Sequence, residues 1–490
     1  MTGAYDAQRS SWVRNDVKIS RASMAKPGFD LVWKMKLAGP GSSLAVPSLL
    51  DFYIGYRGFR TLAFFAASSN HVIAVDTDLS RLEWQNNYAA PGAASQPGCL
   101  GGMTAAVTRP TVTAYPPPPT GQGFGRGSPA KSAVGEPHEG AVILKVLEER
   151  TQPPRPRARP VRPAFNPYAP RVQWALALTG DGKLHSLWVS NGHEPDPGIQ
   201  FVPPNAHALG LIAYGNTAYV ATADKCGGAA NGIWALDIKT KKVTQWKTEN
   251  NIAGNAGPAV GPDGTLYVAA GNELVALAPH TLESLAIYKT NGAEFSSTPV
   301  VFSFQGRNLI AAETKDGRLQ LLDTAALNKG TPLATSGAFS GRNYATGSLT
   351  SWEDPSGARW ILVPAGGSIG ASAGFPLTNG DVSHGAIVAW KVVDRGGSAS
   401  LVPGWISRDM ISPLPPIVVN GVVFAISSGD RHSANAVLYA FDSDTGQELW
   451  SSGKTIGSFV LDGGLAAGGS RIYVATHDGT QYAFGFPIEH

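Results

Sequence analysis

The stretch NGVVFAISSGDRHSANAVLYAFDSDTGQELWSSG, from Asn420 to Gly453, contains one complete structural unit. It consists of a turn, an apolar strand, a loop, a second alternating strand, an Asp-x-x-Thr-Gly turn and a third strand that ends at Trp450. Alternating apolar runs bounded by Gly, Asn and Asp are typical of antiparallel strands joined by tight turns. The unit therefore predicts one antiparallel sheet of short strands.

Copies of this unit recur along the whole chain. Close copies are TLAFFAASSNHVIAVDTDLSRLEWQ, TAYVATADKCGGAANGIWALDIKTKKVTQW and GTLYVAAGNELVALAPHTLESLAIY, and weaker copies bring the total to eight. Their second strands are expected to begin near Leu62, Trp174, Ala218, Leu266, Leu309, Trp360, Val422 and Ile472. Apart from the long first gap, this spacing is the period of a four-stranded propeller blade. We therefore predict an all-β chain, with residues 1–490 forming a single eight-bladed β-propeller.

The two ends of the chain are predicted to meet in the last blade. The final unit stops at Phe486 without an outer strand, while residues 29–37, FDLVWKMKL, resemble an outer strand with no blade of its own. Joining the first and last strands in one sheet leaves no open edge in the ring.

The long first gap contains residues 111–172, which are rich in Pro and Arg. Such a sequence cannot enter a sheet, because Pro lacks the N–H that a strand ladder needs. We expect an extended surface insertion, which is either a solvated loop or an arm that binds a partner.

Composition and charge exclude several classes of protein. The 58 Gly, 36 Pro and 12 Trp residues fit short strands and turns better than helical bundles. A net charge of +3, with basic residues concentrated only around Arg150 to Arg162, gives no nucleic-acid footprint. No apolar run is long enough for a transmembrane segment. The N-terminus MTGAYDAQRSSW lacks the apolar core of a signal peptide, so the protein either stays in the cytoplasm or begins after a removed leader.

The repeat resembles that of pyrroloquinoline quinone (PQQ) propellers. The pattern Asp-x-x-Thr-Gly-x-x-x-Trp occurs from Asp442 to Trp450 and, more loosely, from Asp76 to Trp84. The N-terminal phrase YDAQRSSWVRNDVKIS, followed by FDLVWKMKL, is similar to the opening of quinoprotein alcohol and polyvinyl-alcohol dehydrogenases. The resemblance covers nearly the whole chain outside the insertion, and it specifies the fold more closely than the chemistry.

The resemblance implies a set of site residues. In those dehydrogenases PQQ lies at the mouth of the axis with a calcium ion, a carboxylate base and a cation that contacts the quinone oxygens. Asn272, in the Gly-Asn phrase after LYVAA, matches the calcium-binding Asn. Glu294, before the inner strand SSTPVVF, matches the base, and Lys315 in TKDGRLQLLD matches the cation.

Other family positions depart from the pattern. The family has an adjacent Cys-Cys pair above the quinone, and here Cys99 is followed by Leu100. The family's Trp beneath the quinone falls near Gly254, and its calcium-binding Glu falls at Cys226, with Asp224 two residues away. The resemblance thus implies a degenerate quinone site, with Cys99 and Asp224 as cofactor contacts and Asp224 as a second calcium ligand.

The two cysteines, Cys99 and Cys226, form no C-x-x-C zinc motif and no C-x-x-C-H haem motif. They are either one disulfide or two free thiols. In the predicted fold both lie on loops at the same face of the propeller, and exposed free thiols are disfavoured in oxidising compartments. We predict a disulfide and a periplasmic or extracellular protein.

Ordinary explanations accompany each candidate. Asn272 and Lys315 are common turn residues, and Glu294 and Lys315 could simply pair with each other. His432, beside Asp430 and Arg431, and His477, beside Asp478, lie on loops of the same face. If both histidines converged with Asp224 they would form a metal site, which the sequence alone does not establish.

Two functions follow from these residues. The first is a binding or scaffold propeller that has lost its redox cofactor and takes a small polar ligand or a protein partner at the axis mouth. The alternative is a PQQ- and calcium-dependent oxidoreductase that oxidises an alcohol or polyol and passes electrons to a separate carrier, since no haem motif is present. The missing Trp, the missing adjacent cysteine and the changed calcium ligand favour the first function.

Overall fold

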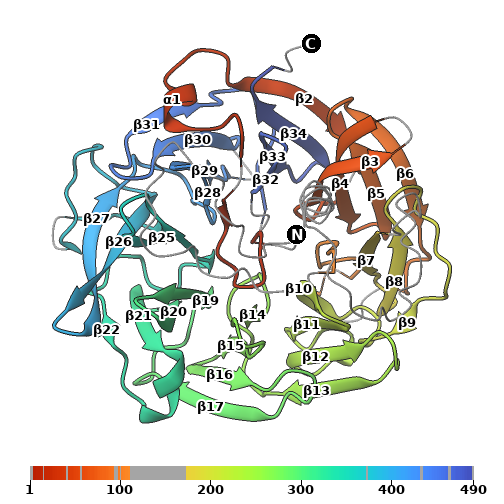
Figure 1. The fold of residues 1–490 in the computed structure, drawn as a ribbon, viewed down its shortest axis with the longest axis horizontal. Coiled ribbons are helices and arrows are strands. Elements are labelled where there is room, and N and C mark those ends of the chain that lie inside the picture. Colours follow the sequence, from red (N-terminus) through yellow and green to blue (C-terminus); the bar gives the residue numbers. More distant parts are fainter. Residues whose placement is uncertain are drawn as a thin grey trace, which may run out of the picture.

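The computed structural model describes residues 4–14, 16–39, 42–55, 58–92, 98–99, 101–110, 173–370, 373–430, 434–461 and 465–487. These residues form eight blade sheets around one axis (Figure 1) and one separate two-stranded sheet, which confirms the all-β, eight-bladed propeller. The insertion at residues 111–172 lies outside the described residues. No helix in the described ranges is long and apolar enough to span a membrane.

Each blade is an antiparallel sheet, and in every blade except blade 2 the first strand of the unit lies nearest the axis. Blade 1 contains β3 Ser48–Gly55, β4 Gly58–Ala67, β5 His71–Asp76 and β6 Arg81–Asn87. Blade 2 contains β7 Trp174–Leu178, β8 Lys183–Trp188 and β9 Ile199–Gln200; blade 3 contains β10 His207–Tyr214, β11 Thr217–Ala223, β12 Gly232–Asp237 and β13 Val243–Lys247. Blade 4 contains β14 Ala259–Val260, β15 Leu266–Ala270, β16 Glu273–Leu277 and β17 Ser284–Lys289.

The second half of the chain repeats this order. Blade 5 contains β19 Val300–Phe304, β20 Arg307–Thr314, β21 Arg318–Asp323 and β22 Ala334–Thr335; blade 6 contains β24 Thr350–Glu353, β25 Arg359–Gly366, β26 Gly385–Arg395 and β27 Ser398–Ile406. Blade 7 contains β28 Ile417–Val419, β29 Val422–Ser427, β30 Val437–Asp442 and β31 Glu448–Ser451. Blade 8 contains β32 Ala466–Gly468, β33 Arg471–Ala475 and β34 Thr480–Gly485.

Short elements lie outside the blade order. They are β1 Trp12–Val13, β18 Ser297–Thr298, β23 Gly347–Ser348, the helix α1 Arg21–Met24 and two 3-10 helices, η1 Cys226–Gly228 and η2 Thr324–Lys329. β18 and β23 pair with each other in parallel. In blade 2 the innermost position is taken by the residues around Thr108, which bridges Leu176.

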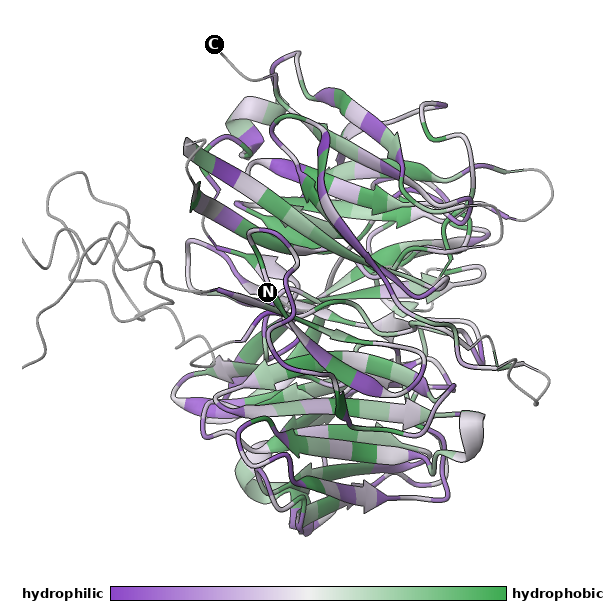
Figure 2. Ribbon diagram, turned by 90° about the vertical axis from the view of Figure 1, so that its right-hand side faces the viewer, coloured by the Kyte–Doolittle hydropathy of each residue, from purple (hydrophilic) through white to green (hydrophobic). Residues whose placement is uncertain are grey.

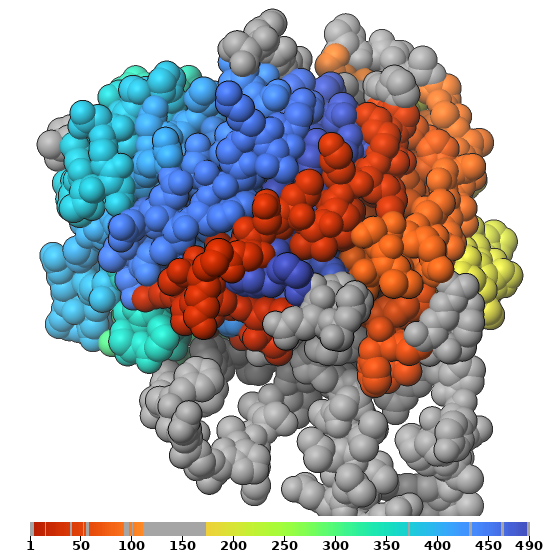
Figure 3. Space-filling view, turned by 90° about the horizontal axis from the view of Figure 1, so that it is seen from above, coloured from red at the N-terminus to blue at the C-terminus, as the bar shows by residue number. Residues whose placement is uncertain are grey.

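The N-terminal strand closes the ring, as predicted. β2, Asp30–Lys36, is the outer strand of blade 8 and pairs antiparallel with β34, so that Asp30 faces Gly485 and Lys36 faces Thr480. Figure 3 shows the N-terminal region, in red, between the last blade, in blue, and the first, in orange. The first and last blades are therefore joined through a sheet made from both ends of the chain.

Apolar side chains pack between neighbouring blades. Figure 2 shows that hydrophobic residues are concentrated in the stacked strands. The cluster between blades 7 and 8, for example, contains the fully buried Phe424 and Ile472. Burial on both faces explains why the second and third strands are almost continuously apolar. The hydrophobic cores therefore lie between neighbouring blades. The blade residues near the axis come from the ends of the inner strands.

Tryptophans on outer strands connect several blades to the next one. The indole Nε1 of Trp33 donates to the Thr77 carbonyl oxygen at 2.9 Å, and that of Trp405 donates to the Ser443 carbonyl oxygen at 2.8 Å. Gly446 lies beneath the Trp405 ring, and a Cβ there would come within 2.3 Å of a ring carbon. The Gly of the Asp-x-x-Thr-Gly turn therefore leaves room for the Trp of the preceding blade to pack on the turn.

Residues 4–14 run near the axis, inside the ring of blades (Figure 1). Their carbonyl oxygens accept hydrogen bonds from the inner strands of blades 4 to 7: Val260 to Ala7 at 2.7 Å, Val301 to Gln8 at 3.1 Å, Ser351 to Ser10 at 2.9 Å and Val418 to Ser11 at 2.9 Å. Arg9 is 0% exposed and donates to the carbonyl oxygens of Pro258 and Gly210. We call residues 4–14 the axial segment.

Candidate functional site

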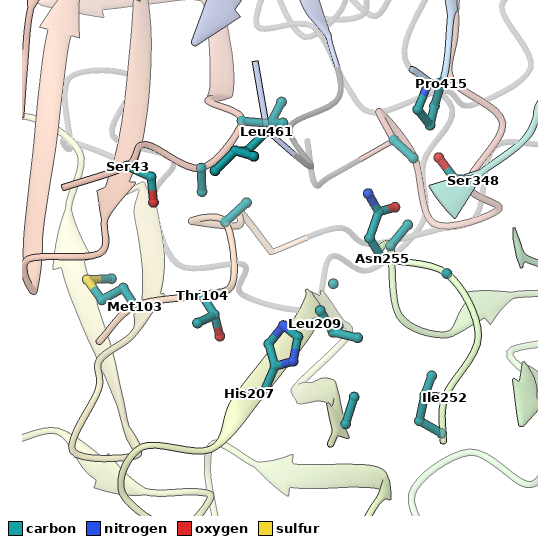
Figure 4. A pocket seen from close by; sticks show the side chains of 18 of the residues that line it. Ser43, Met103, Thr104, His207, Leu209, Ile252, Asn255, Ser348, Pro415 and Leu461 are labelled. Carbon is teal, nitrogen blue, oxygen red and sulfur yellow. The ribbon is translucent and has the colours of Figure 1, made fainter. Parts of the chain in front are cut away.

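A cavity of about 400 Å³ lies on the axis, above the axial segment (Figure 4). Ala4 and Ser11 of the axial segment contribute to its wall. The rest comes from inner strands and from the loops that join them, and much of it is aliphatic: Leu44, Val46, Met103, Leu209, Ile252 and Leu461. An apolar concave site with a few polar groups is the usual form of a small-molecule site.

A hydrogen-bonded trio of polar residues lies on the wall formed by blades 3 and 4, and single polar side chains such as Thr104 and Ser348 line other parts of the cavity. Nδ1 of His207, the first residue of β10, lies 2.6 Å from Oδ2 of Asp224. Nδ2 of Asn251 donates to Oδ1 of the same carboxylate at 2.6 Å. All three residues line the cavity, and the imidazole of His207 points into it (Figure 4).

Backbone geometry holds this trio in place. Asp224 has a φ of +60°, in the left-handed region, where an Asp is tolerated in a tight turn. Its N–H donates to Asn251 Oδ1 at 2.9 Å, so the side chain of Asn251 both donates to and accepts from Asp224. Among the described residues, Nε2 of His207 has no hydrogen-bond partner, which leaves it able to contact a ligand.

The predicted disulfide is present. Cys99 and Cys226 are bonded, with Cα atoms 5.6 Å apart. Cys226 is 1% exposed and neither cysteine is among the residues that line the cavity, although Gly101 and Asp224, each two residues away, do line it. The bond therefore joins the entry to blade 2 and the β11–β12 loop behind the cavity wall. The predicted contact of Cys99 with a cofactor stays a prediction.

The structure brings Glu294 and Lys315 together. Nζ of Lys315 lies 2.6 Å from Oε2 of Glu294, and the two side chains are 46% and 55% exposed. Asn272 lies in the β15–β16 turn, where its carbonyl oxygen accepts a hydrogen bond from the N–H of Thr290. None of the three residues lines the axial cavity. Their assignment as base, quinone contact and calcium ligand stays a prediction.

Lys315 and His477 occupy the same position of one recurring turn. The hydroxyl of Thr314 donates to Asp316 at 2.6 Å, and that of Thr476 donates to Asp478 at 2.5 Å. Thr179 and Asp181 repeat this arrangement with a Gly at the second position. The turn is thus held by its Thr and Asp, and its second residue is free to vary.

The histidine candidates do not join Asp224 among the described residues. His477 stacks on Phe459, with ring centroids 4.6 Å apart, and it does not line the cavity. Arg431 and His432 lie outside the described residues. The described ranges contain no group of three or more His, Cys, Asp or Glu residues that could hold a metal ion. Calcium binding by Asn272 and Asp224 stays a prediction.

The expected site of the quinone's Trp floor has no room for a side chain. Gly254 lines the cavity with a φ of +74°, and a Cβ there would lie 2.0 Å from the Thr298 nitrogen and 2.3 Å from the Gly347 carbonyl oxygen. The described lining holds no Trp, Tyr, Phe, Lys or Arg. A planar tricarboxylate such as PQQ needs flat faces and cations, so the residues present do not fit it.

His207 and Asn251 were not predicted from the sequence. Both stand at or just before inner strands, in NAHALGLIAY and ENNIAGNAGP, where a polar side chain among small residues is brought to the axis. That position is the signal that could have identified them.

We expect the Glu294–Lys315 pair to contribute little to stability. Both side chains are about half exposed, and exposed ion pairs typically contribute about 0–1 kcal/mol. Glu294→Gln and Lys315→Ala should each change the free energy of unfolding by less than about 1 kcal/mol, measured by urea unfolding. Lys289→Ala, which breaks the pair with Glu273, whose side chains are 63% and 22% exposed in that order, is the control. A loss above about 2 kcal/mol would contradict a purely exposed pair.

Comparisons with known proteins agree with the repeat. A family model described as outer membrane protein assembly factor BamB matches residues 433–485. No curated protein matches the sequence. Similar solved structures include quinohemoprotein alcohol dehydrogenase from Comamonas testosteroni, at 13% identity and a TM-score of 0.57, covering 100% of this chain and 81% of that chain.

Two further structures extend this likeness. A europium-containing methanol dehydrogenase has 11% identity and a TM-score of 0.55, covering 98% of this chain and 96% of that chain. BamB from Moraxella catarrhalis has 14% identity and a TM-score of 0.50, covering 94% and 99%. At these identities the likeness establishes the fold alone. The chain is therefore an eight-bladed propeller, and the family model of BamB matches it within the last two blades.

Proposed function

We propose that this protein is an exported binding propeller whose axial cavity holds a small uncharged ligand with an aliphatic body and at least one hydroxyl or amide group. The cavity itself carries the proposal. Much of its wall is aliphatic, and the hydrogen-bonded trio of His207, Asp224 and Asn251 lies on the side formed by blades 3 and 4, with single Ser, Thr and Asn side chains elsewhere. Such a site orients a ligand by one end and excludes water along the other.

Charge favours a neutral ligand over an organic acid. Asp224 is the one carboxylate among the described lining residues, and no lysine or arginine offsets it there. An anionic ligand would have to enter next to that carboxylate without a cationic partner, which is unfavourable in a partly enclosed site. A hydroxyl group could instead donate to Asp224 or to Nε2 of His207, which is an acceptor when Nδ1 donates to Asp224.

The disulfide supports export. Structural disulfides form and persist in oxidising compartments, such as the periplasm and the cell exterior, and are rare in the cytosol. The likeness to BamB supports a protein partner as a further interaction. Under this proposal the Pro- and Arg-rich insertion at residues 111–172 is an arm that such a partner could bind.

The alternative function is a quinoprotein dehydrogenase that uses PQQ and calcium. The contact between Glu294 and Lys315 is the observation that favours it, because the resemblance assigns these two residues to the quinone site. In that case quinone binding should weaken in Glu294→Gln and Lys315→Ala by more than about 0.5 kcal/mol, the size of an ordinary surface change.

One experiment separates the two functions. We expect crystals soaked in cyclohexanol to show the ring among the aliphatic residues of the cavity and the hydroxyl at His207 or Asp224. The same protein, incubated with PQQ and calcium and then desalted, should retain no quinone absorbance and should not oxidise ethanol in a dye-linked assay. Retained stoichiometric PQQ with dye reduction would instead establish the dehydrogenase.

A matched pair of variants locates the binding. Asp224→Ala removes the carboxylate and should weaken cyclohexanol binding about tenfold, the usual loss for a hydrogen bond to a charged group. Asp409→Ala removes a carboxylate that binds His384 Nδ1 at the same distance of 2.6 Å but does not line the cavity. Equal binding by both variants would place the ligand elsewhere.

A further inference from the structure

A second, much smaller cavity lies where the axial segment meets blades 5 and 6. Its volume is about 10 Å³, enough for a single water molecule or a monatomic ion. Gln8, Ser10 and Arg14 of the axial segment form one side, and Ser303, Ser351 and Arg359 of the two blades form the other.

Two guanidinium groups face this space, and no carboxylate is among its described lining residues. Arg359 is 3% exposed, and its Cζ lies 5.7 Å from the ring centroid of Trp12, while that of Arg14 lies 4.4 Å from it. Burial lowers the pKa of Arg359 to about 10, and Glu353 opposes this effect, so the group stays charged at neutral pH. The two cations are therefore close together in a water-poor site.

Carboxylates contact these arginines only from outside the cavity. Nη2 of Arg359 donates to Glu353 Oε2 at 2.6 Å, and Nη1 of Arg14 lies 3.5 Å from Asp6 Oδ2. Asp354, next to Glu353, accepts hydrogen bonds from Ser356 and Trp360 in its own turn. Glu353 and the Ser303 carbonyl oxygen accept from Nη2 of Arg359, and its Nε is left for another acceptor.

The buried groups at the cavity are donors that lack acceptors. Arg359 Nε and Ser351 Oγ are buried and have no hydrogen-bond partner among the described residues. An arginine Nε–H can only donate, and a serine hydroxyl can donate as well. A buried donor without an acceptor costs about 1–3 kcal/mol, so some acceptor is expected here.

An anion satisfies these groups better than water does. A water molecule could accept from the same donors, but it would bring no negative charge to two guanidinium groups in a cavity whose described lining holds no carboxylate. A halide ion accepts from every donor and needs no acceptor. It also places a negative charge between two cations.

We infer that this cavity is a halide site, occupied by one chloride ion that accepts from Ser351 and Arg359 and fastens the axial segment to blades 5 and 6. The axial segment also forms part of the wall of the larger cavity through Ala4 and Ser11. By fastening the axial segment, the halide thus stabilises the part of the larger cavity's wall that this segment forms. This inference is independent of what the larger cavity binds.

Bromide tests the site directly. Crystals of the unmodified protein are transferred from sodium chloride to sodium bromide, and anomalous differences are measured at the bromine absorption edge. We expect a peak within contact distance of Ser351 Oγ and Arg359 Nε. Density there that carries no anomalous signal would identify a water molecule and overturn the inference.

Thermal unfolding provides an independent test in solution. The midpoint should be higher in sodium chloride than in sodium gluconate of the same ionic strength, by roughly 1–3 °C and with saturation as chloride rises. Ser351→Ala, which removes one donor and keeps both arginines, should lose at least half of this difference. Ser407→Ala, an equally buried serine in blade 6, should keep it. An equal chloride effect in Ser351→Ala and the unmodified protein would indicate a general salt effect and refute the site.

Discussion

Trp33→Ala is expected to lower the free energy of unfolding by about 3–5 kcal/mol, as for other buried Trp-to-Ala changes. Trp33 is 7% exposed and packs in a cluster that contains Leu49 and Phe65 of blade 1 and Tyr473 of blade 8. Its indole also donates to the Thr77 carbonyl oxygen, which would lose a buried partner. The substitution removes apolar packing and a hydrogen bond at the one junction where the ring is closed by distant parts of the chain.

Urea unfolding, followed by tryptophan fluorescence and circular dichroism together, measures the loss. Lys34→Ala on the same strand is the control, because Lys34 is exposed and should change stability by less than about 0.5 kcal/mol. Trp405→Ala removes the equivalent contact between blades 6 and 7, which are joined by a continuous chain. A loss below about 1 kcal/mol for Trp33→Ala would contradict the importance of this junction.

Most of the ring could be predicted because each blade is specified by residues that are close together in the sequence. Alternating apolar runs between Gly- and Asp-rich turns located all eight second strands, and the unpaired phrase FDLVWKMKL located the closing strand. Blade 2 was the least regular, since the insertion separates the inner residues around Thr108 from their partner Leu176.

The axial segment could not be predicted from local pattern. Tyr5, Arg9 and Ser11 all have positive φ, so this stretch has neither helical nor strand periodicity. Its partners are inner-strand N–H groups in four different blades, hundreds of residues away. Such contacts become apparent only once the blades have been assembled in space.

The candidate site was predicted in part. Asp224 lines the cavity and the disulfide is formed, and the contact between Glu294 and Lys315 follows from the order of the loops. The search for a quinone site, however, led to loops outside the cavity. His207 was missed because its role depends on an inner strand that begins beside the axis, which no single motif encodes.

The double variant Cys99→Ala with Cys226→Ala is expected to lose about 5 kcal/mol of stability, because the bond closes a loop with a sequence separation of 127 residues. In the chain-entropy model the bond acts mainly by restricting the unfolded chain, and the restriction grows with loop length. The loop here contains blade 2 and the long insertion, so it is large. Alanine is preferred to serine at Cys226, since a hydroxyl would be buried there without an assured partner.

The same model predicts what the double variant should retain. In the folded protein Cys226 follows β11, and the nearby Asp224 is held by Asn251 and His207 rather than by the disulfide. The variant should therefore bind cyclohexanol with unchanged affinity at temperatures where it remains folded, although its urea midpoint falls. If stability changed by less than about 1 kcal/mol while binding was lost, the bond would instead act by shaping the cavity wall in the native state, and the entropic account would be wrong.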